Sequence, residues 1–229
     1  MSYLKSRIIS LTLFTALGLG ALQIPIAKLA GAKSFFTLFD LFAPTAGAFF
    51  GGIPGAFSVG IMQLAHMLIH GTLNDTASLI RLFPMMAAAV YFAKKNSLGI
   101  IVPLLAILVF TMHPIGRSVW YFSLFWTIPI ICFFLRDRWL FARALGATFT
   151  AHAVGGALWI HAFSLPATVW ISLIPVVIIE RTVFAVGISL TYCVVMNCAA
   201  LFTRTKSWRT ALTLEPRYLL RKLRAGFDE

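Results

Sequence analysis

Residues 35–70 read FFTLFDLFAPTAGAFFGGIPGAFSVGIMQLAHMLIH, an apolar stretch able to lie in a bilayer. A Gly-Gly-Ile-Pro-Gly segment at 51–55 divides the stretch and predicts two short membrane spans joined by a helix break. Four polar side chains interrupt the apolar pattern: Asp40, Gln63, His66 and His70. Because ionisable groups are expensive in hydrocarbon, each is a candidate functional residue. We expect a helical hairpin that presents polar groups to a cavity.

The composition of the whole chain is that of a membrane protein. Of its 229 residues 60% are hydrophobic and 11% are charged, and the mean hydropathy is +0.90. A soluble domain has about one half apolar and one quarter charged residues, and a spanning helix takes about 20 apolar residues. We therefore expect an all-α integral membrane protein of the cell membrane, a multi-pass bundle of six to eight transmembrane helices.

The basic residues predict the orientation of this bundle. Fourteen of the nineteen Lys and Arg fall near the N-terminus, at 94–95, at 136–143 and after residue 202. Basic loops stay in the cytoplasm, so the net charge of +12 indicates orientation rather than nucleic-acid binding, and both termini are expected to be cytoplasmic.

The expected apolar segments are 8–27, 35–50, 54–70, 77–93, 98–112, 118–135, 139–161 and a run from 167 to 202, in which Pro175 could end a lead-in piece. Several segments are short, so six full spans plus a broken pair is an open alternative.

The chain is expected to divide into a transmembrane bundle over 1–203 and a basic cytoplasmic amphipathic tail over 204–229. Residues 214–224, LEPRYLLRKLR, predict an interfacial helix. Tyr218 and Leu219 would face the lipid bilayer, while Arg217 and Arg221 would reach anionic head groups.

With this topology nearly all the intramembrane polar groups fall in the outer half of the spans. This asymmetry predicts an outward-facing pocket for a small polar molecule, with Trp120, Trp159 and Trp170 as aromatic walls. Alternatively, the same groups form ion pairs, such as Asp40 with Arg81, that fix helix register. The candidate substrate-binding residues are Asp40, Gln63, His66, His70, Arg81, His152, Trp159 and Glu180.

Other chemistry has little support in the sequence. His66 and His70 have a spacing that could hold a metal or haem iron, but no cysteine or further carboxylate adjoins them, so no metal or cofactor is expected. There is no HExxH motif and no Gly-x-Ser-x-Gly elbow, which argues against an enzyme. The three cysteines, Cys132, Cys193 and Cys198, match neither a redox pair nor a zinc motif and are expected to be buried thiols.

Four parts of the sequence together resemble a transporter family. They are a small-residue face at Thr12, Ala16 and Gly20, the Gly/Pro-rich segment 41–57, the segment AHAVGGALW at 151–159 and the segment WISLIPVVIIER at 170–181. These resemble the substrate-binding S components of energy-coupling factor (ECF) transporters. The resemblance implies a membrane subunit that captures a vitamin or similar micronutrient from outside and works with a transmembrane coupling subunit and cytoplasmic ATPases. It also implies that Ala16 and Gly20 contact the coupling subunit.

The chain departs from that family in its number of segments. The family typically has six helices, and the hairpin over 98–135 is the apparent surplus here. Two other functions are therefore kept as alternatives: a stand-alone proton-coupled carrier, and a histidine-based haem or metal membrane protein.

Overall fold

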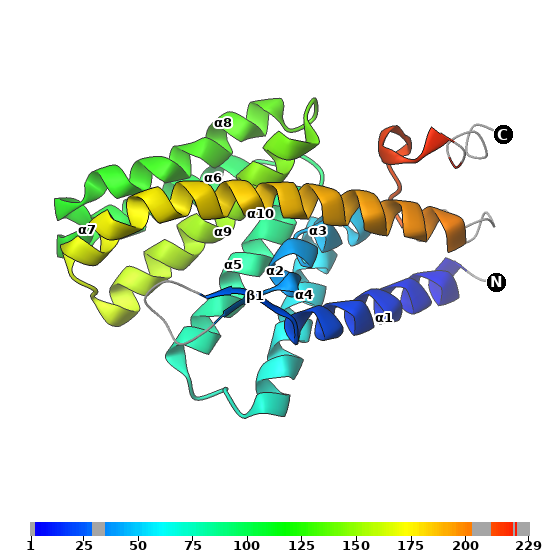
Figure 1. Cartoon of the computed structure of the whole chain (residues 1–229), viewed down its shortest axis with the longest axis horizontal. Coiled ribbons are helices and arrows are strands. Elements are labelled where there is room, and N and C mark those ends of the chain that lie inside the picture. Colours follow the sequence, from blue (N-terminus) through cyan, green and yellow to red (C-terminus); the bar gives the residue numbers. More distant parts are fainter. Residues whose placement is uncertain (1–2, 29–34, 203–211, 222, 224–229) are drawn as a thin grey trace.

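The computed structural model describes residues 3–28, 35–202, 212–221 and 223, and most of them are helical (Figure 1). The helices are α1 (Tyr3–Leu22), α2 (Leu38–Phe42), α3 (Thr45–Phe50), α4 (Gly52–His70), α5 (Thr76–Phe92), α6 (Leu98–Met112), α7 (Pro114–Ser118), α8 (Ile128–Leu135), α9 (Leu140–Phe163) and α10 (Ala167–Phe202), with 3₁₀ helices η1 (Trp120–Thr127) and η2 (Pro216–Tyr218). Strands β1 (Pro25–Lys28) and β2 (Phe35–Thr37) form an antiparallel pair.

Within the described ranges, three helices are long and apolar enough to cross a membrane: α1, α4 and α10. Shorter apolar helices cover 38–50, 76–92, 98–112 and 120–135. Many exposed side chains are large and apolar, including Ile69, Phe134 and Ile179, each at least two-thirds exposed. A helical chain with this surface is a membrane protein, because lipid solvates such side chains and water does not.

The helix break predicted at 51–55 is confirmed at Gly51, whereas residues 52–55 already belong to α4. Helix α3 ends at Phe50 and α4 begins at Gly52, and Gly51 between them has φ +94°. L-residues rarely adopt this backbone conformation, so glycine is needed there. Nearby, a Cβ on Gly47 would lie 1.8 Å from the carbonyl oxygen of Ala89, which shows how closely α3 approaches α5.

Four predicted segments differ from the structure. The span predicted over 8–27 ends as a helix at Leu22, because Pro25–Lys28 pair with β2 as strand β1. Residues 35–50 are not one helix, because 35–37 pair with β1 as strand β2 and a break at 43–44 separates α2 from α3. Residues 118–135 are divided between the end of α7, the 3₁₀ helix η1 and α8. Pro175 does not end a helix: it lies inside α10, whose full length is 36 residues, about 54 Å at the helical rise.

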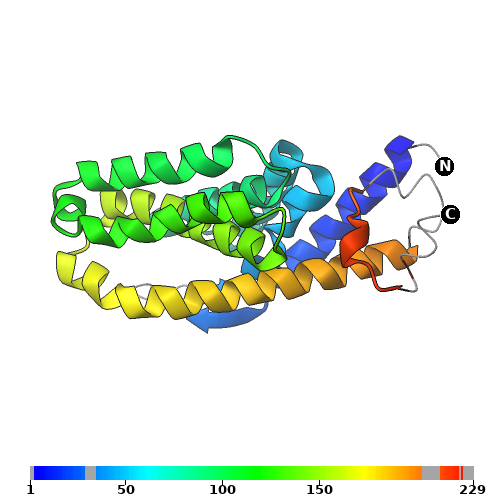
Figure 2. The same cartoon turned by 90° about the horizontal axis from the view of Figure 1, so that it is seen from above.

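Helix α9 is the centre of the bundle and packs against α5, α6, α8 and α10. Helix α10 runs along the length of the molecule in both views (Figures 1 and 2). The start of α1 and the end of α10 lie at the same end of the molecule in both views. This end is called the terminal end below.

The tail returns to the bundle, and the amphipathic helix predicted over 214–224 is wrong for 214–220, where only the short 3₁₀ helix η2 forms. The Thr213 N–H donates to the Phe49 carbonyl oxygen at 3.1 Å, and the Leu220 N–H donates to the Asn197 Oδ1 at 2.7 Å. Leu219 is buried in the core next to α10 rather than facing lipid. Backbone groups of the tail are therefore paired partly with the bundle and partly in local turns, such as Tyr218 N–H to the Glu215 carbonyl oxygen, without a continuous helix.

Candidate functional site: a polar cavity

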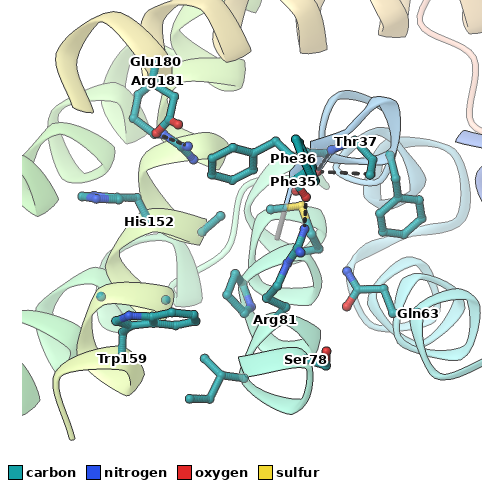
Figure 3. Close-up of a pocket in the computed structure, with 18 of the residues that line it drawn as sticks. Phe35, Phe36, Thr37, Gln63, Ser78, Arg81, His152, Trp159, Glu180 and Arg181 are labelled. Carbon is teal, nitrogen blue, oxygen red and sulfur yellow. Dashed lines mark hydrogen bonds and ion pairs between the residues drawn. The ribbon is translucent and has the colours of Figure 1, made fainter. Parts of the chain in front are cut away.

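A cavity of about 530 Å³ lies where β2, α2, α4, α5, α9 and α10 meet (Figure 3). Its walls are mainly apolar and include Phe36, Met67, Trp159, Trp170 and Leu173. A concave, mostly apolar space of 300–1,000 Å³ with a few polar groups is the usual form of a small-molecule site.

Of the eight candidate substrate-binding residues, seven line this cavity: Asp40, Gln63, His66, Arg81, His152, Trp159 and Glu180. The eighth, His70, is one helical turn beyond His66; its ring stacks on that of His66 at 4.0 Å and its Nδ1 lies 2.9 Å from the His66 carbonyl oxygen. Of the other two predicted aromatic walls, Trp170 lines the cavity, whereas Trp120 is 55% exposed and does not. Sequence reasoning missed Phe35 and Phe36, since nothing local indicated that they form a strand.

Strand β2 is held over the cavity by two polar residues. Asp40 is buried and its Oδ2 accepts hydrogen bonds from the N–H and the hydroxyl of Thr37, at 2.7 and 3.3 Å. Arg81 donates from Nη2 to the carbonyl oxygen of Phe35 at 2.8 Å. The expected ion pair between Asp40 and Arg81 is not formed. Each side chain instead binds its own end of β2, so the strand forms a wall of the cavity.

Glu180 and Arg181 form an ion pair of 2.6 Å beside the cavity. The Arg181 side chain is almost fully buried, donates from Nη1 to the Thr148 hydroxyl at 3.3 Å, and lies 5.1 Å from the centre of the Phe36 ring. Glu180 is therefore paired within the protein, as the ion-pair alternative predicts. The paired guanidinium of Arg181 also packs on the ring of Phe36 and holds it in the cavity wall.

Gln63 carries the clearest sign of an incomplete site. Its side chain is 9% exposed, and within the described parts of the chain its Oε1 is buried without a hydrogen-bond partner. An unpaired buried acceptor costs about 1–3 kcal/mol. Gln63 borders the cavity, but its Oε1 exposes almost no surface, so a donor on a bound molecule could satisfy this oxygen only after the side-chain amide turns toward the cavity.

The imidazole of His152 is fixed by its neighbour Trp126. The Trp126 Nε1–H donates to His152 Nδ1 at 3.0 Å, and Trp126 is fully buried. In Figure 3 His152 lies between Trp159 and the Glu180–Arg181 pair.

The histidines do not assemble a metal site in the described ranges, where no group of three or more His, Cys, Asp or Glu could hold an ion. His113 accepts from the Ile115 N–H at 3.2 Å, and His161 Nε2 lies 3.0 Å from the Val109 carbonyl oxygen. Among the cysteines, Cys132 is buried as expected, but Cys198 is exposed.

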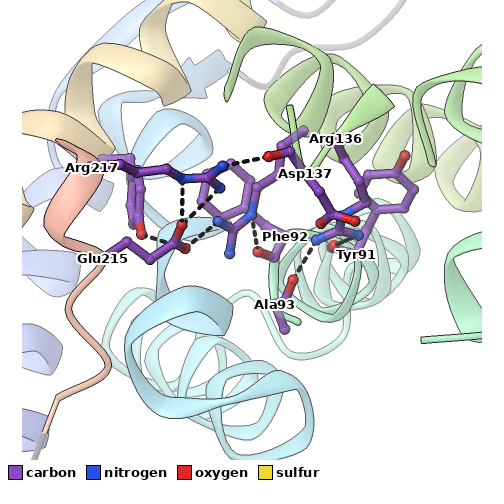
Figure 4. Close-up of polar contacts among 9 residues, drawn as sticks. Tyr91, Phe92, Ala93, Arg136, Asp137, Glu215 and Arg217 are labelled. Carbon is purple, nitrogen blue, oxygen red and sulfur yellow. Dashed lines mark hydrogen bonds and ion pairs between the residues drawn. The ribbon is translucent and has the colours of Figure 1, made fainter. Parts of the chain in front are cut away.

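A second polar cluster fastens the tail near the terminal end (Figure 4). Glu215 accepts from Arg143 at 2.5 Å, from the Tyr192 hydroxyl at 2.9 Å and from Arg217 at 2.9 Å. Burial alone would raise the pKa of Glu215, but Arg143 and the hydrogen bonds of Tyr192 and Arg217 hold this pKa below its usual value. Arg136 donates to the carbonyl oxygens of Tyr91 and Ala93 at the end of α5.

The small-residue face of α1 is uncovered. Ala16 and Gly20 are exposed, and a Cβ on Gly20 would meet nothing within 4 Å among the described atoms. A search of protein-family models, curated proteins and solved structures finds no match for this chain.

Proposed function

We propose that this chain is a multi-pass protein of the cell membrane that binds a small molecule in the cavity, as a substrate-binding subunit similar to the S components of ECF transporters. The supporting observation is a cavity of ligand size that is lined by polar groups from α2, α4, α5, α9 and α10 and bordered by Gln63, whose acceptor is unpaired. The protein binds and delivers its ligand without transforming it.

The proposed topology has six to eight spans with both termini in the cytoplasm. The docked tail, whose Glu215 binds Arg143, lies near the end of α10 (Figure 1). Basic groups favour the cytoplasmic side, so the terminal end is the cytoplasmic one. With both termini cytoplasmic, the alternation of spans would place the C-terminal end of α4 on the outer side, and the cavity that borders His66 would open outward.

In this proposal the uncovered face of α1 contacts a transmembrane coupling subunit, with Ala16 and Gly20 allowing close helix approach. Cytoplasmic ATPases would then supply the energy for release. Uptake by the isolated protein that collapses when an uncoupler removes the proton gradient would refute this dependence on partners and favour a stand-alone carrier.

Native mass spectrometry of gently purified protein tests the binding itself. A co-purifying small molecule is expected with the wild type and with Trp120→Leu, because Trp120 lies outside the cavity. It should be depleted in Gln63→Leu, which removes the amide at similar size, and in Trp159→Leu, which keeps an apolar side chain but makes it smaller. Equal occupancy in all four proteins, or no bound molecule in any of them, would refute the proposal.

A further inference from the structure

His152 has one nitrogen whose role is decided by Trp126. The indole Nε1–H of Trp126 is a donor and can never accept, so the atom 3.0 Å away must be an unprotonated acceptor. Turning the imidazole over would place Cδ2–H at that position and lose the bond. An imidazolium would carry a proton on Nδ1 and oppose two donors. The hydrogen bond therefore selects the neutral tautomer with its proton on Nε2.

Trp126 cannot easily leave this position. It is 0% exposed and makes edge contacts with Phe110 and Phe122, at centroid separations of 5.0 and 6.4 Å. The indole also packs on Gly156 of α9, where an added Cβ would lie 2.6 Å from Cζ2 of Trp126. A buried, interlocked indole is a rigid donor, and this rigidity passes to the imidazole it holds.

The remaining polar atom of His152 is available to the cavity. The residue lines the cavity and is only half-buried, and in the part of the chain that the structure describes its single hydrogen bond is the one to Trp126. The Nε2–H is therefore a donor without a protein acceptor. The guanidinium of Arg181, which also lines the cavity, has only donors and cannot accept this proton.

We infer that Trp126 is a positioning residue for the site and that His152 Nε2–H binds a hydrogen-bond acceptor, a carbonyl or carboxylate oxygen, on the ligand. The inference rests on the proposed function, because it assigns a chemical group to the ligand of that same cavity. Trp126 does not itself line the cavity. Trp126 acts by keeping the proton of His152 on Nε2. The cavity is then offered a donor, so a ligand group that has donors only is rejected.

The tautomer can be measured without any ligand. Nitrogen NMR of protein labelled with ¹⁵N-histidine distinguishes the two neutral tautomers and the cation, and a His152→Phe variant assigns the signal of His152. The Nε2–H form is expected in the wild type and in the control Trp120→Phe. In Trp126→Phe both neutral tautomers of His152 should be populated. A wild-type His152 found as the Nδ1–H tautomer or as the cation at neutral pH would overturn the inference.

Two fragments of similar size test the preference for an acceptor. Benzamide carries a carbonyl oxygen, whereas benzylamine carries an ammonium group with donors only. Benzamide is expected to bind and to shift the His152 Nε2 signal, and His152→Phe, which removes the donor, should weaken it about 2- to 12-fold, the equivalent of one hydrogen bond. Trp126→Phe leaves the donor in place but no longer selects it, so it should weaken benzamide binding measurably but less than His152→Phe does. If Trp126→Phe does not fold, the loss in His152→Phe alone tests the assigned donor.

The results that refute the inference differ from those that refute the proposed function. Stronger binding of benzylamine, or no shift of His152 with either fragment, would overturn the assignment of an acceptor group to this site. Neither outcome touches the co-purification experiment, in which loss of the bound molecule from Gln63→Leu and Trp159→Leu would still support a ligand cavity.

Discussion

Replacing Glu215 by glutamine tests how the tail is held to the bundle. This carboxylate is the acceptor shared by Arg143, Tyr192 and Arg217, and the side chains of Glu215 and Arg143 are 26% and 7% exposed. A hydrogen bond to a charged group contributes about 1.5–3 kcal/mol. Because Glu215 is partly solvated and glutamine keeps one oxygen acceptor, we expect Glu215→Gln to cost about 2 kcal/mol of docking free energy.

Hydrogen exchange of the docked tail measures this loss directly. The amides of Thr213 and Leu220 are bonded to the bundle and exchange only when the tail opens. A loss of 2 kcal/mol corresponds to about 30-fold faster exchange. The matched control is Asp137→Asn at the same end, where the Lys95–Asp137 pair is 3.6 Å long and 68% exposed on the aspartate side; it should change exchange by no more than about 2-fold.

The same network predicts a pH dependence. The folded pKa of Glu215 lies below that of a free glutamate, so its stabilisation is fully present above about pH 5 and is lost as the pH falls through the folded pKa. Protection, corrected for intrinsic exchange, should fall in acid for the wild type and stay flat for Glu215→Gln. Unchanged exchange in Glu215→Gln at neutral pH, or equal acceleration in Asp137→Asn, would refute the account of the tail.

Two further substitutions test the fold, each with a neighbouring control. Arg136→Met removes the buried donor to two carbonyl oxygens at the end of α5. It should lower the free energy of unfolding by about 3 kcal/mol, or Tm by about 6–12 °C. The control Arg138→Met, at an exposed position, should leave Tm within about 2 °C of the wild type. Gly51→Ala places a Cβ on a residue with φ +94° and should lower the free energy of unfolding, measured by thermal unfolding, by about 1–3 kcal/mol. The control is Gly52→Ala, whose new Cβ would lie at an ordinary contact distance of 3.4 Å from Ala93. Equal losses in a variant and its control would contradict the local explanation.

Local features of the sequence predicted the helix break and much of the cavity lining. Gly51 marks a break because the conformation it adopts is closed to other residues. Polar side chains in apolar helices gather on one cavity because burying each alone is costly. This reasoning brought Asp40, Gln63 and His152 into one list, although they lie on three helices far apart in the chain.

The errors have a common cause in contacts between distant parts of the chain. Phe35 and Phe36 read as helical, but pairing with β1 and the Arg81 hydrogen bond to Phe35 hold them as a strand. Leu219 reads as lipid-facing, but the returning tail buries it in the bundle. The contacts that hold Phe35 and bury Leu219 come from other segments of the chain, so the spacing of apolar residues within one segment does not predict them.

The sequence by itself determined the class of the protein and the place of its main turn. Sixty per cent hydrophobic residues demand a lipid environment, and the glycines at 51–52 divide the stretch 35–70 whatever surrounds it. Only the tertiary structure decided which polar groups pair with each other and which stay open. Glu180 is neutralised by Arg181, Asp40 is used to hold β2, and Gln63 keeps a free acceptor. The reason is that a hydrogen bond depends on distances of about 3 Å, and the packing of helices from the whole chain sets those distances.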